Sequence, residues 1–441
     1  DPGTAKFTKQ DGCICHVGNG SSSVGTVFGA SEPWARWWKI LSIENILGYQ
    51  LEPSVDALKQ VLGPIETARG LPNACYTEPA SIEAEQRRLF GEGWVCAGFV
   101  TDVPSIGDLF PFEFSGLPLF MVRGVDSVIR VFHNVCSHRG RILVEEPKTV
   151  KKSVVCPYHS WSYGLEGELI SSPHIGGPGK HSCPYLDKHS VALSKVRSAE
   201  WFNLVFIDLS GLAPEFSDYI SPVVQRWKEF EGIPLVHTGV DSTITLEIDC
   251  NWKLAIENYC EAYHLPWVHP NLNSYSPLES HYSIVGENFS GQGSDSYSPS
   301  FSHEVKEFPT APGLPSFWET RAEYIALYPN VLLGIHRDHF YAVLITPEGS
   351  RRTHERLKIF YYDEAVRKSS FDAAREANRK QWQSIFLEDR SAVESMQRGR
   401  QSPGFKGGVF SPVMEQTTHA FHAWVARALL EGRGSKVATF D

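Results

Sequence analysis

Cys136-Ser-His138 and Cys156-Pro-Tyr-His159, with seventeen residues between them, form the stretch that decides the fold. Each half places one thiol and one imidazole close together on a short segment. Two Cys and two His can bind either a zinc ion or an iron–sulfur cluster. Zinc fingers usually pair Cys with Cys and His with His, whereas each half here is mixed. Two mixed loops can supply two Cys to one iron of a [2Fe-2S] cluster and two His to the other, so the spacing favours the cluster over a structural zinc site.

This pattern resembles the Rieske [2Fe-2S] proteins. In that family a glycine usually follows the second His, whereas this chain has Ser160, a small change that we expect the loop to tolerate. Tyr158 and Trp161 are expected to pack over the cluster loops and to limit the access of solvent to them. The resemblance implies that the cluster-binding residues are Cys136, His138, Cys156 and His159.

Composition narrows the class of protein. The chain has 441 residues, of which 42% are hydrophobic and 21% charged, as expected for a globular protein with two domains. Its net charge of −10 argues against nucleic-acid binding, and no uninterrupted apolar run is long enough for a membrane span. Nine cysteines without disulfide-like spacing indicate a reducing compartment, either the cytoplasm or an organelle stroma or matrix. Cys13-Ile-Cys15-His16 has metal-like spacing, but its isolation in a Gly/Ser-rich segment argues against a site there.

Two patterns of secondary structure follow one another along the chain. Short alternating segments over residues 94–133 and 191–207 predict a small antiparallel β domain with the two Cys/His loops at its tips. After Gly211, helical and strand-like segments mix, which predicts a separate α+β domain. We therefore expect an N-terminal tail and helical extension over 1–70, the cluster domain over 71–210, and a second domain over 211–441.

In the second domain the longest helical pattern covers residues 364–399. Residues 285–320 are rich in Ser, Gly and Pro and are expected to form a loop. Further helices are expected from about Trp252 to His264 and over 419–430. The strands are expected at 243–248, 331–333, 340–346 and 356–362.

A second group of candidate metal ligands lies within residues 251–270. On a helix, positions i and i+3 share a face, so Glu261 and His264 are expected to point the same way. Pro266 then disfavours continuation of the helix, and the chain can turn to bring His269 back toward His264. Two imidazoles and one carboxylate with open coordination positions form the facial triad of non-haem Fe(II) oxygenases. The alternative is a His pair with a purely structural role.

Together the two motifs resemble the α subunits of Rieske non-haem iron oxygenases, also called ring-hydroxylating oxygenases, over about residues 71–432. The resemblance implies an α+β chain, in which a Rieske antiparallel β domain precedes a catalytic domain with a helix-grip, START-like antiparallel sheet. It also implies a mononuclear Fe(II) ion held by His264, His269 and a third ligand on the long C-terminal helix. Glu388-Asp389 followed by a Gln-Arg-Gly run matches the family pattern, so the third ligand is expected to be Asp389, with Glu388 as its nearest rival.

Asn258 and Glu261, which precede the paired His, are expected to be catalytic residues. In the family, an acidic residue three before the first His contacts a cluster His across a subunit interface. Glu261 would then bridge to His159 of the partner subunit and couple the two metal sites. Such a head-to-tail contact closes into a ring, so the resemblance implies a homotrimer. The alternative is that Glu261 only orients His264 within one chain.

The resemblance also narrows the reaction. The run Glu257-Asn-Tyr-Cys-Glu-Ala-Tyr-His264 and the C-terminal residues 397–424 are similar to the carnitine, glycine betaine and choline monooxygenases. This similarity implies an oxygenase that receives electrons from NAD(P)H through a reductase or ferredoxin component. With O2 it would hydroxylate an N-methyl or neighbouring C–H bond of a small-molecule substrate, a quaternary ammonium or betaine-like compound. The alternative on the same iron site is hydroxylation of an aromatic ring by a monooxygenase or dioxygenase.

Aromatic faces hold a trimethylammonium group, because that group has no hydrogen-bond donor. An anionic end of the same substrate would need an arginine, and the sequence offers Arg321, Arg337, Arg351 and Arg352. Two classes outside the oxygenases are a Rieske electron carrier and a START-like binding protein, and the predicted second iron site argues against both. The aromatic candidates for a cage are Tyr275, Tyr282, Phe289, Tyr297, Phe301, Phe317, Trp318, Tyr324 and Tyr328.

Overall fold

The computed structural model describes residues 53–299 and 306–433. The metal-like run Cys13-Ile-Cys15-His16 and most of the predicted extension over 1–70 lie outside these residues. Within the described ranges, no helix combines the length and the apolar content that crossing a membrane requires.

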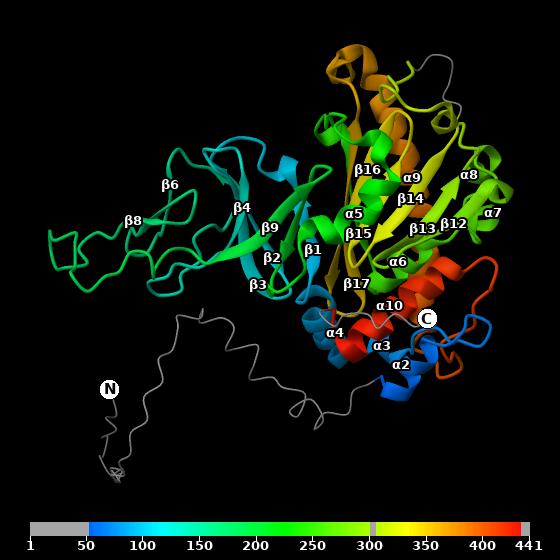
Figure 1. The fold of residues 1–441 in the computed structure, drawn as a ribbon, viewed down its shortest axis with the longest axis horizontal. Helices are drawn as coiled ribbons and strands as arrows, with labels where there is room; N and C mark the ends of the chain where they lie inside the picture. The colour runs from blue at the N-terminus through cyan, green and yellow to red at the C-terminus, as the bar shows by residue number, and fades with distance from the viewer. Residues whose placement is uncertain (1–52, 300–305, 434–441) are drawn as a thin grey trace, which may run out of the picture. The chain divides into compact units, whose positions relative to one another are not determined.

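The first domain is built on a seven-stranded antiparallel sheet, shown in cyan and green in Figure 1. Its order is β1-β10-β9-β4-β3-β2-β5, so the first strand of the domain pairs with the last. Phe120 of β3 lies opposite Phe132 of β4 with ring centroids 5.7 Å apart, which helps to fix the register of this pair. The strands are β1 (Trp94–Phe99), β2 (Asp108–Phe114), β3 (Leu117–Arg123), β4 (Ile129–His133), β5 (Lys148–Thr149), β9 (Lys195–Trp201) and β10 (Leu204–Asp208).

A three-stranded antiparallel sheet carries one of the two Cys/His loops. It consists of β6 (Ser153–Val155), β7 (Ser162–Gly164) and β8 (Leu169–Ser171). Cys156 lies in the loop between β6 and β7, and Cys136 lies in the loop that follows β4. A small core of buried apolar side chains, which includes both cysteines, supports the two loops from below.

The second domain contains a seven-stranded antiparallel sheet of order β11-β17-β16-β15-β14-β13-β12. An antiparallel sheet with long helices packed on it agrees with the expected catalytic domain, and the mixed content agrees with an α+β chain. The strands are β11 (Thr243–Ile248), β12 (His281–Val285), β13 (Phe289–Ser294), β14 (Ala322–Leu327), β15 (Val331–Ile335), β16 (His339–Glu348) and β17 (Arg352–Tyr361).

The prediction of a loop over residues 285–320 is wrong at its start, where β12 ends and β13 lies. Glycines are depleted in strands, which is why this Gly/Ser-rich segment gives no strand signal. Here the glycines are required by packing. A Cβ on Gly291 would lie 1.9 Å from the carbonyl oxygen of Tyr324, and one on Gly293 would lie 2.2 Å from the ring of Tyr282.

Both faces of the second sheet are buried. Alternate side chains of β16 point to opposite faces, so Tyr341 and Val343 pack with the helices, whereas Phe340 and Leu344 pack with β1 and α5 (Phe216–Arg226). The helical layer consists of α6 (Trp252–Cys260), α9 (Asp372–Gly399) and α10 (Gln416–Glu431). Figure 1 shows α9, in orange, running along the strands of the sheet. Its predicted start at residue 364 is wrong, because two short 3-10 turns occupy residues 364–371.

Short N-terminal helices pack against the second domain. They are α2 (Val55–Val61), α3 (Ala74–Thr77) and α4 (Pro79–Glu85), and a π-helical turn, Gln86–Phe90, follows them. Glu85 forms a fully buried ion pair with Lys253 of α6 and accepts a hydrogen bond from the indole of Trp252. The segment around α3 and α4 is therefore part of the packing that holds α6, although the predicted boundaries assign it to the first domain.

Candidate active site

The two Cys/His loops share one backbone conformation. The carbonyl of Cys136 accepts the amide of Gly140 at 2.9 Å, and the carbonyl of Cys156 accepts the amide of Ser160 at 3.0 Å. The residue that closes each turn is in the left-handed region, with φ of 72° at Gly140 and 57° at Ser160. Two equivalent turns therefore present their Cys and His side chains in the same way.

The thiols of the two loops face inward and the imidazoles face outward. Cys136 and Cys156 are 2% and 1% exposed, whereas His138 lies at the surface. The rings of His138 and His159 are 4.6 Å apart, and Trp161 stacks on His138 at 4.6 Å with an interplanar angle of 6°. Neither thiol is in a disulfide. Two buried thiols beside two paired imidazoles fit the donor set that a Rieske cluster needs.

Tyr163, on β7, contacts the buried end of this group. Its hydroxyl lies 3.3 Å from Sγ of Cys136 and accepts the backbone N–H of Ser137 at 3.1 Å. Burial, followed by the neighbouring Cys136, raises the pKa of the Tyr163 hydroxyl above its ordinary value, so it stays protonated at neutral pH. Because its oxygen already accepts from Ser137, its hydrogen is available to the cysteine sulfur.

The second group of candidate ligands begins where α6 ends. The prediction of a continuous helix to His264 is wrong, because α6 ends at Cys260 and Glu261 is extended. The Glu261 carboxylate accepts backbone N–H groups of the next turn, including that of His264 at 3.3 Å. Pro266 lies in the first turn of α7 (Leu265–Val268), where its missing N–H costs no helical hydrogen bond. The capped turn, and not a shared helix face, brings Glu261 to His264.

His264, His269 and Asp389 converge. Oδ1 of Asp389 lies 2.8 Å from Nε2 of His269 and 3.6 Å from Nε2 of His264, and ligand atoms of all three lie within 4.8 Å of one another. Asp389 comes from α9, and both histidines flank α7. Two imidazole nitrogens and one carboxylate oxygen in such a space fit the facial donor set for Fe(II).

The outer nitrogen of each imidazole is held by a different carboxylate. Nδ1 of His264 lies 2.6 Å from Oε1 of Glu261, and Nδ1 of His269 lies 2.7 Å from Oε2 of Glu388. Burial lowers the pKa of both imidazoles, but these carboxylates and Asp389 outweigh it, so the pKa of each is raised. Glu388, the rival ligand, therefore points at the far side of His269, which leaves both Nε2 atoms facing Asp389.

One face of α9 supplies both Asp389 and a wall of the adjoining cavity. Trp382, Ile385 and Phe386 precede Asp389 at spacings of seven, four and three residues, which places all four on one side of the helix. This wall was not predicted from the sequence, although the helical spacing of these residues from Asp389 indicates it. The Trp382 indole N–H donates to Nε2 of His339 at 2.9 Å, which fixes the ring.

Strand and helix residues complete the cavity. Of the nine aromatic candidates named from the sequence, the cavity lining includes Tyr324. Asn258, predicted to be catalytic, also lines it, and within the described residues its amide has no hydrogen-bond partner. The rings of Tyr341 and Trp382 are 4.4 Å apart. The lining residues are Asn258, Tyr259, His264, Leu265, His269, Leu272, Ser276, His281, Gln292, Tyr324, Tyr341, Trp382, Ile385, Phe386 and Asp389.

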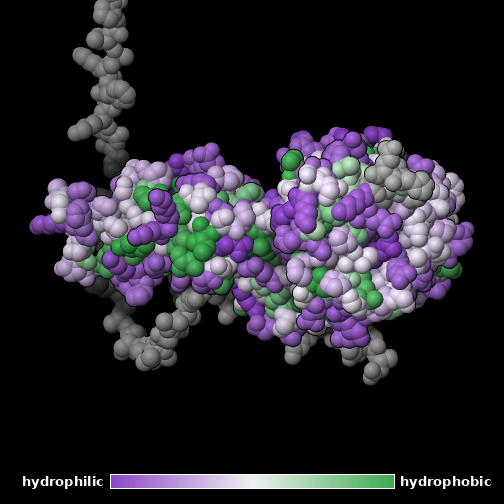
Figure 2. Space-filling view, turned by 90° about the horizontal axis from the view of Figure 1, so that it is seen from above, coloured by the Kyte–Doolittle hydropathy of each residue, from purple (hydrophilic) through white to green (hydrophobic). Residues whose placement is uncertain are grey.

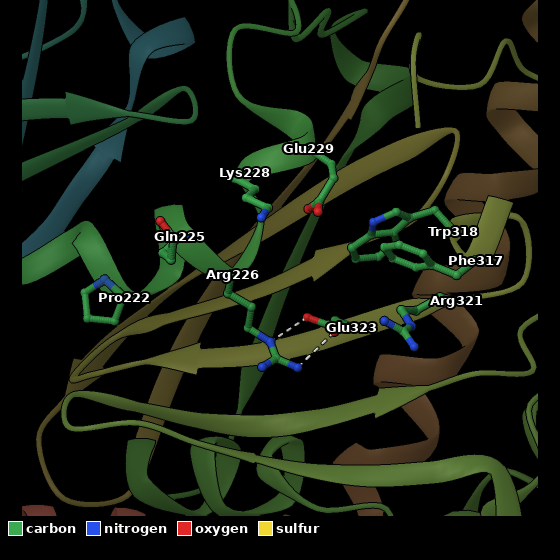
Figure 3. Close-up of a pocket in the computed structure, with 9 residues that line it drawn as sticks. All are labelled: Pro222, Gln225, Arg226, Lys228, Glu229, Phe317, Trp318, Arg321 and Glu323. Atoms are coloured by element: carbon green, nitrogen blue, oxygen red, sulfur yellow. Dashed lines mark hydrogen bonds and ion pairs between the residues drawn. The ribbon is translucent and has the colours of Figure 1, made fainter. Parts of the chain in front are cut away.

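A second hollow, drawn in Figure 3, opens between α5 and β14. Two of its charged groups are paired with each other, since Arg226 makes two hydrogen bonds to Glu323 at 2.7 and 2.9 Å. Arg321 lies over the ring of Phe317 at 4.7 Å and pairs with Asp295. Arg321, predicted as one candidate for binding an anionic substrate, therefore lies in this hollow and does not line the cavity beside the histidines.

Two sequence families match the chain in succession. Residues 93–186 match the Rieske [2Fe-2S] domain, and residues 236–431 match the ring hydroxylating alpha subunit (catalytic domain). The carnitine monooxygenase oxygenase subunit of Acinetobacter baumannii is 24% identical over 348 residues, which cover 78% of this chain and 88% of that protein. The chloroplastic choline monooxygenase of Beta vulgaris is 28% identical over 377 residues, covering 83% of this chain and 78% of that protein.

Solved structures support the fold. A quaternary ammonium Rieske monooxygenase aligns with a TM-score of 0.68 at 21% identity, covering 85% of this chain and 98% of its own. Naphthalene 1,2-dioxygenase from Rhodococcus aligns with a TM-score of 0.66 at 19% identity, covering 87% and 99%. Proteins named for very different substrates thus share this two-domain architecture. The fold alone therefore does not indicate the substrate of this chain, and the residues that line its cavity have to.

Proposed function

Because this chain belongs to the Rieske oxygenases, with a Rieske [2Fe-2S] domain followed by a ring-hydroxylating catalytic domain, we propose that it oxidises a quaternary ammonium compound. As a Rieske oxygenase it works with a [2Fe-2S] cluster, a mononuclear iron, O2 and a reductase partner that supplies electrons from NAD(P)H. The reaction is hydroxylation of an N-methyl or neighbouring C–H bond. Relatives named for carnitine and choline support this choice of substrate.

The aromatic and acidic character of the cavity carries this proposal. The aromatic rings of Tyr324, Tyr341, Trp382 and Phe386 line it, together with the carboxyl group of Asp389. Among the described residues that line the cavity there is no Lys or Arg. A cation without hydrogen-bond donors is stabilised by such faces through cation–π attraction, by about 1–2 kcal/mol per desolvated contact.

The two loops of the first domain would hold the cluster. Cys136 and Cys156 would bind one iron through their buried sulfurs, and His138 and His159 would bind the other. Burial raises the pKa of the Cys136 thiol, so a bound metal is what keeps it as a thiolate. A [2Fe-2S] cluster bound there accepts and passes on single electrons. His138 is exposed and His159 is half-buried, so these imidazoles would bring the cluster close to the surface of the domain.

In the catalytic domain His264, His269 and Asp389 would hold the iron. Fe(II) bound there would supply the chemistry that activates O2. Glu261 and Glu388 fix the imidazoles by accepting from their Nδ1–H groups, which directs both Nε2 atoms inward. The aromatic wall places the substrate and excludes water, and the free amide of Asn258 can bind a polar group beside the iron.

A head-to-tail trimer would bring the two metal sites together across subunits. Figure 1 shows the strands β6 and β8, near the cluster loops, far from α7 and α8 (Pro270–Tyr275) beside the iron site. An exposed aromatic side chain lies near each site: Tyr158, in a cluster loop, is 59% exposed, and Trp267, in α7, is 73% exposed. Hydrophobic patches are visible on the first domain in Figure 2. Covering such patches favours association. In this ring Glu261 would bridge to His159 of the partner subunit.

Oxidation of an aromatic ring is the second candidate, because aromatic walls also pack well against an arene. The two candidates differ in their products. Hydroxylation at an N-methyl group gives a carbinolamine, which collapses and releases formaldehyde, whereas dihydroxylation of an arene gives a diol. The acidic surroundings of the cavity favour the cation.

Oxygen uptake tests the proposal directly. The iron-loaded chain is combined with a reductase and NADH and offered choline, carnitine, glycine betaine and simple aromatic acids. Uptake coupled to product with a quaternary ammonium compound supports the proposal, and coupled turnover of arenes alone contradicts it. His264→Ala should abolish uptake while the visible spectrum of the cluster stays unchanged. About three Fe and two sulfides per chain are expected, where a plain electron carrier would hold about two Fe.

A further inference from the structure

One wall of the cavity is polar but uncharged. The carbonyl of Glu261 accepts the side-chain amide of Gln292 at 3.2 Å, which fixes the orientation of that amide. Its oxygen therefore faces Nδ1 of His281, and Nδ1 donates to it. Nε2 of His281 lies 3.0 Å from Oγ of Ser276 and 3.2 Å from the carbonyl oxygen of the same residue. An amide, an imidazole and a hydroxyl group thus form one hydrogen-bonded wall of the cavity.

The environment keeps His281 neutral. Burial lowers the pKa of its imidazole, and the hydrogen bonds to Gln292 and to the Ser276 carbonyl do not reverse that direction. His281 therefore offers no positive charge to a substrate at neutral pH. Gln292, Ser276 and Asn258 add amide and hydroxyl groups to this side of the cavity, all of them neutral.

The arginines that could bind an anionic group lie elsewhere. Arg321 is paired with Asp295 at the other hollow, shown in Figure 3. Arg352 pairs with Glu247 and Glu348 on an exposed strand end. Arg337 and Arg351 do not line the cavity. Within the described residues, the substrate therefore meets no guanidinium or ammonium group.

The charges around the iron site oppose an anion as well. Glu261, Glu388 and Asp389 surround the two imidazoles and carry three formal negative charges. An Fe(II) ion bound there would offset only part of this negative charge. A substrate carboxylate brought out of water into this space would lack a positive partner, which is strongly unfavourable.

We infer that the substrate is a quaternary ammonium compound whose other end is a neutral hydrogen-bonding group, such as an alcohol, and not a carboxylate. This inference rests on the proposed function. The aromatic wall selects the cationic end, and the wall of Gln292, His281 and Ser276 suits a hydroxyl group, which can both donate and accept. Betaines and carnitine, which carry a carboxylate, are then poorer substrates than aminoalcohols of the same size.

Three probes of similar size test the inference on the complete, iron-loaded chain with its reductase. Choline and glycine betaine differ in having a CH2OH group or a carboxylate, and 3,3-dimethylbutan-1-ol replaces the nitrogen of choline by carbon. We expect kcat/KM from product-coupled oxygen uptake to be about tenfold or more higher for choline than for glycine betaine. An equal or higher value for glycine betaine overturns the inference. If neither ammonium compound surpasses the uncharged alcohol, the proposed function itself fails.

Two variants sharpen the result. Gln292→Arg places a cation in the neutral wall, and we expect it to shift the ratio of kcat/KM toward glycine betaine while the cluster spectrum reports that the chain is folded. Arg321→Ala is the matched control at the other hollow, and it should leave the ratio unchanged. A selective loss of glycine betaine turnover in Arg321→Ala would show that a carboxylate is recognised after all, and would overturn the inference.

Discussion

At the scale of single residues, the two cluster turns differ in one respect. Gly140 and Ser160 both adopt a positive φ, but glycine alone does so without steric strain. Serine in the left-handed region costs about 1 kcal/mol relative to an allowed conformation. The sequence predicted that the loop tolerates Ser160, and the matching hydrogen bonds of both turns show how: the fold keeps the conformation in spite of the strain.

Ser160→Gly should stabilise the cluster loop. We expect the free energy of unfolding to rise by up to about 1 kcal/mol, because the removed strain at this φ exceeds the conformational entropy that glycine adds to the unfolded chain. Chemical denaturation followed by the visible absorbance of the cluster measures the change. Gly140→Ala in the equivalent turn is the control and should destabilise by a similar amount. A loss of stability in Ser160→Gly would contradict the equivalence of the two turns.

Tyr163→Phe should lower the reduction potential of the cluster. The hydroxyl is 3.3 Å from Sγ of Cys136, and hydrogen bonds to cluster sulfurs raise the potential by favouring the reduced form. A redox titration should show a fall of some tens of millivolts. Tyr158→Phe, which alters a tyrosine that is 59% exposed, should leave the potential nearly unchanged. Equal potentials in wild type and Tyr163→Phe would remove the proposed hydrogen bond.

Substitutions at Glu388 and Asp389 should distinguish the proposed iron ligand, Asp389, from the residue that orients a ligand, Glu388. Asp389→Asn is expected to reduce the iron content from about three to about two per chain, because the carboxylate ligand is lost. Glu388→Ala should retain a weaker site, with iron affinity reduced about 10–100-fold, because only the partner of His269 Nδ1 is removed. Iron analysis after dialysis at graded chelator concentrations compares them. If Glu388→Ala lost the mononuclear iron completely while Asp389→Asn retained it, Glu388 and not Asp389 would be the ligand.

At the scale of helices and strands, the predictions succeeded where apolar patterns were regular. The strand Thr243–Ile248 was predicted with its observed bounds, and β14 was missed because Ala322–Leu327 adjoins the Gly- and Pro-rich segment assigned to a loop. The end of α6 was placed too late, since propensity does not show that the Glu261 side chain caps the following turn. The cavity needed tertiary information, because residues from strands and α9 meet only in the fold.

The beginning of α6 and the end of α9 are fastened together. Gln397 accepts the amide of Asn251 at 2.9 Å and donates to the carbonyl of Tyr76 at 3.0 Å. Arg400 pairs with Glu257 and donates to a carbonyl of the N-terminal segment. The Gln-Arg-Gly run recognised in the sequence therefore has a structural role. It holds the helix that carries Asp389 against the helix that leads to His264.

Glu257 makes this fastening sensitive to acid. Burial alone would raise the pKa of Glu257, but His422 and Arg400 lower it from 4.5 to about 2. Because the folded pKa is below the unfolded one, the carboxylate stabilises the fold above about pH 4.5, and this contribution is lost as the pH falls toward 2. It amounts to at most about 3 kcal/mol.

The stability difference between wild type and Glu257→Gln should therefore shrink from pH 6 to pH 3 in denaturation curves. Glu247→Gln, at an exposed ion pair, should show little change, and a constant difference for Glu257→Gln would contradict the assignment.

At the scale of the whole molecule, the first domain covers one face of the second sheet. Asp102, next to β1, binds both Arg356 and Lys358 of β17, and Asn330 donates to the backbone of Cys96 at 2.9 Å. These contacts fix the two domains of one chain to each other. In the proposed trimer, the cluster would therefore approach another subunit through assembly, and the relay would not depend on a hinge between the two domains. The predicted domain boundaries and the reducing compartment remain predictions.

Mixed oligomers should distinguish a relay between subunits from one within a chain. Cys156→Ser removes a cluster ligand, and His264→Ala removes an iron ligand, so each variant alone should be inactive. When the two variants are co-expressed, a mixed trimer would pair the intact cluster of one chain with the intact iron site of its neighbour. We then expect a substantial fraction of wild-type oxygen uptake to return. Light scattering should report three chains per particle. Absence of any recovery in such mixed particles would place the relay within one chain.

The single face of α9 that presents Trp382, Ile385 and Phe386 beside Asp389 also bears on how such an enzyme changes over time. The same helix carries the proposed metal ligand and, one and two turns earlier, the side chains that shape the cavity. Exchanging side chains along its earlier turns can remodel that cavity while the metal stays in register. New substrates can therefore be acquired by point substitutions, with the oxidising centre inherited unaltered.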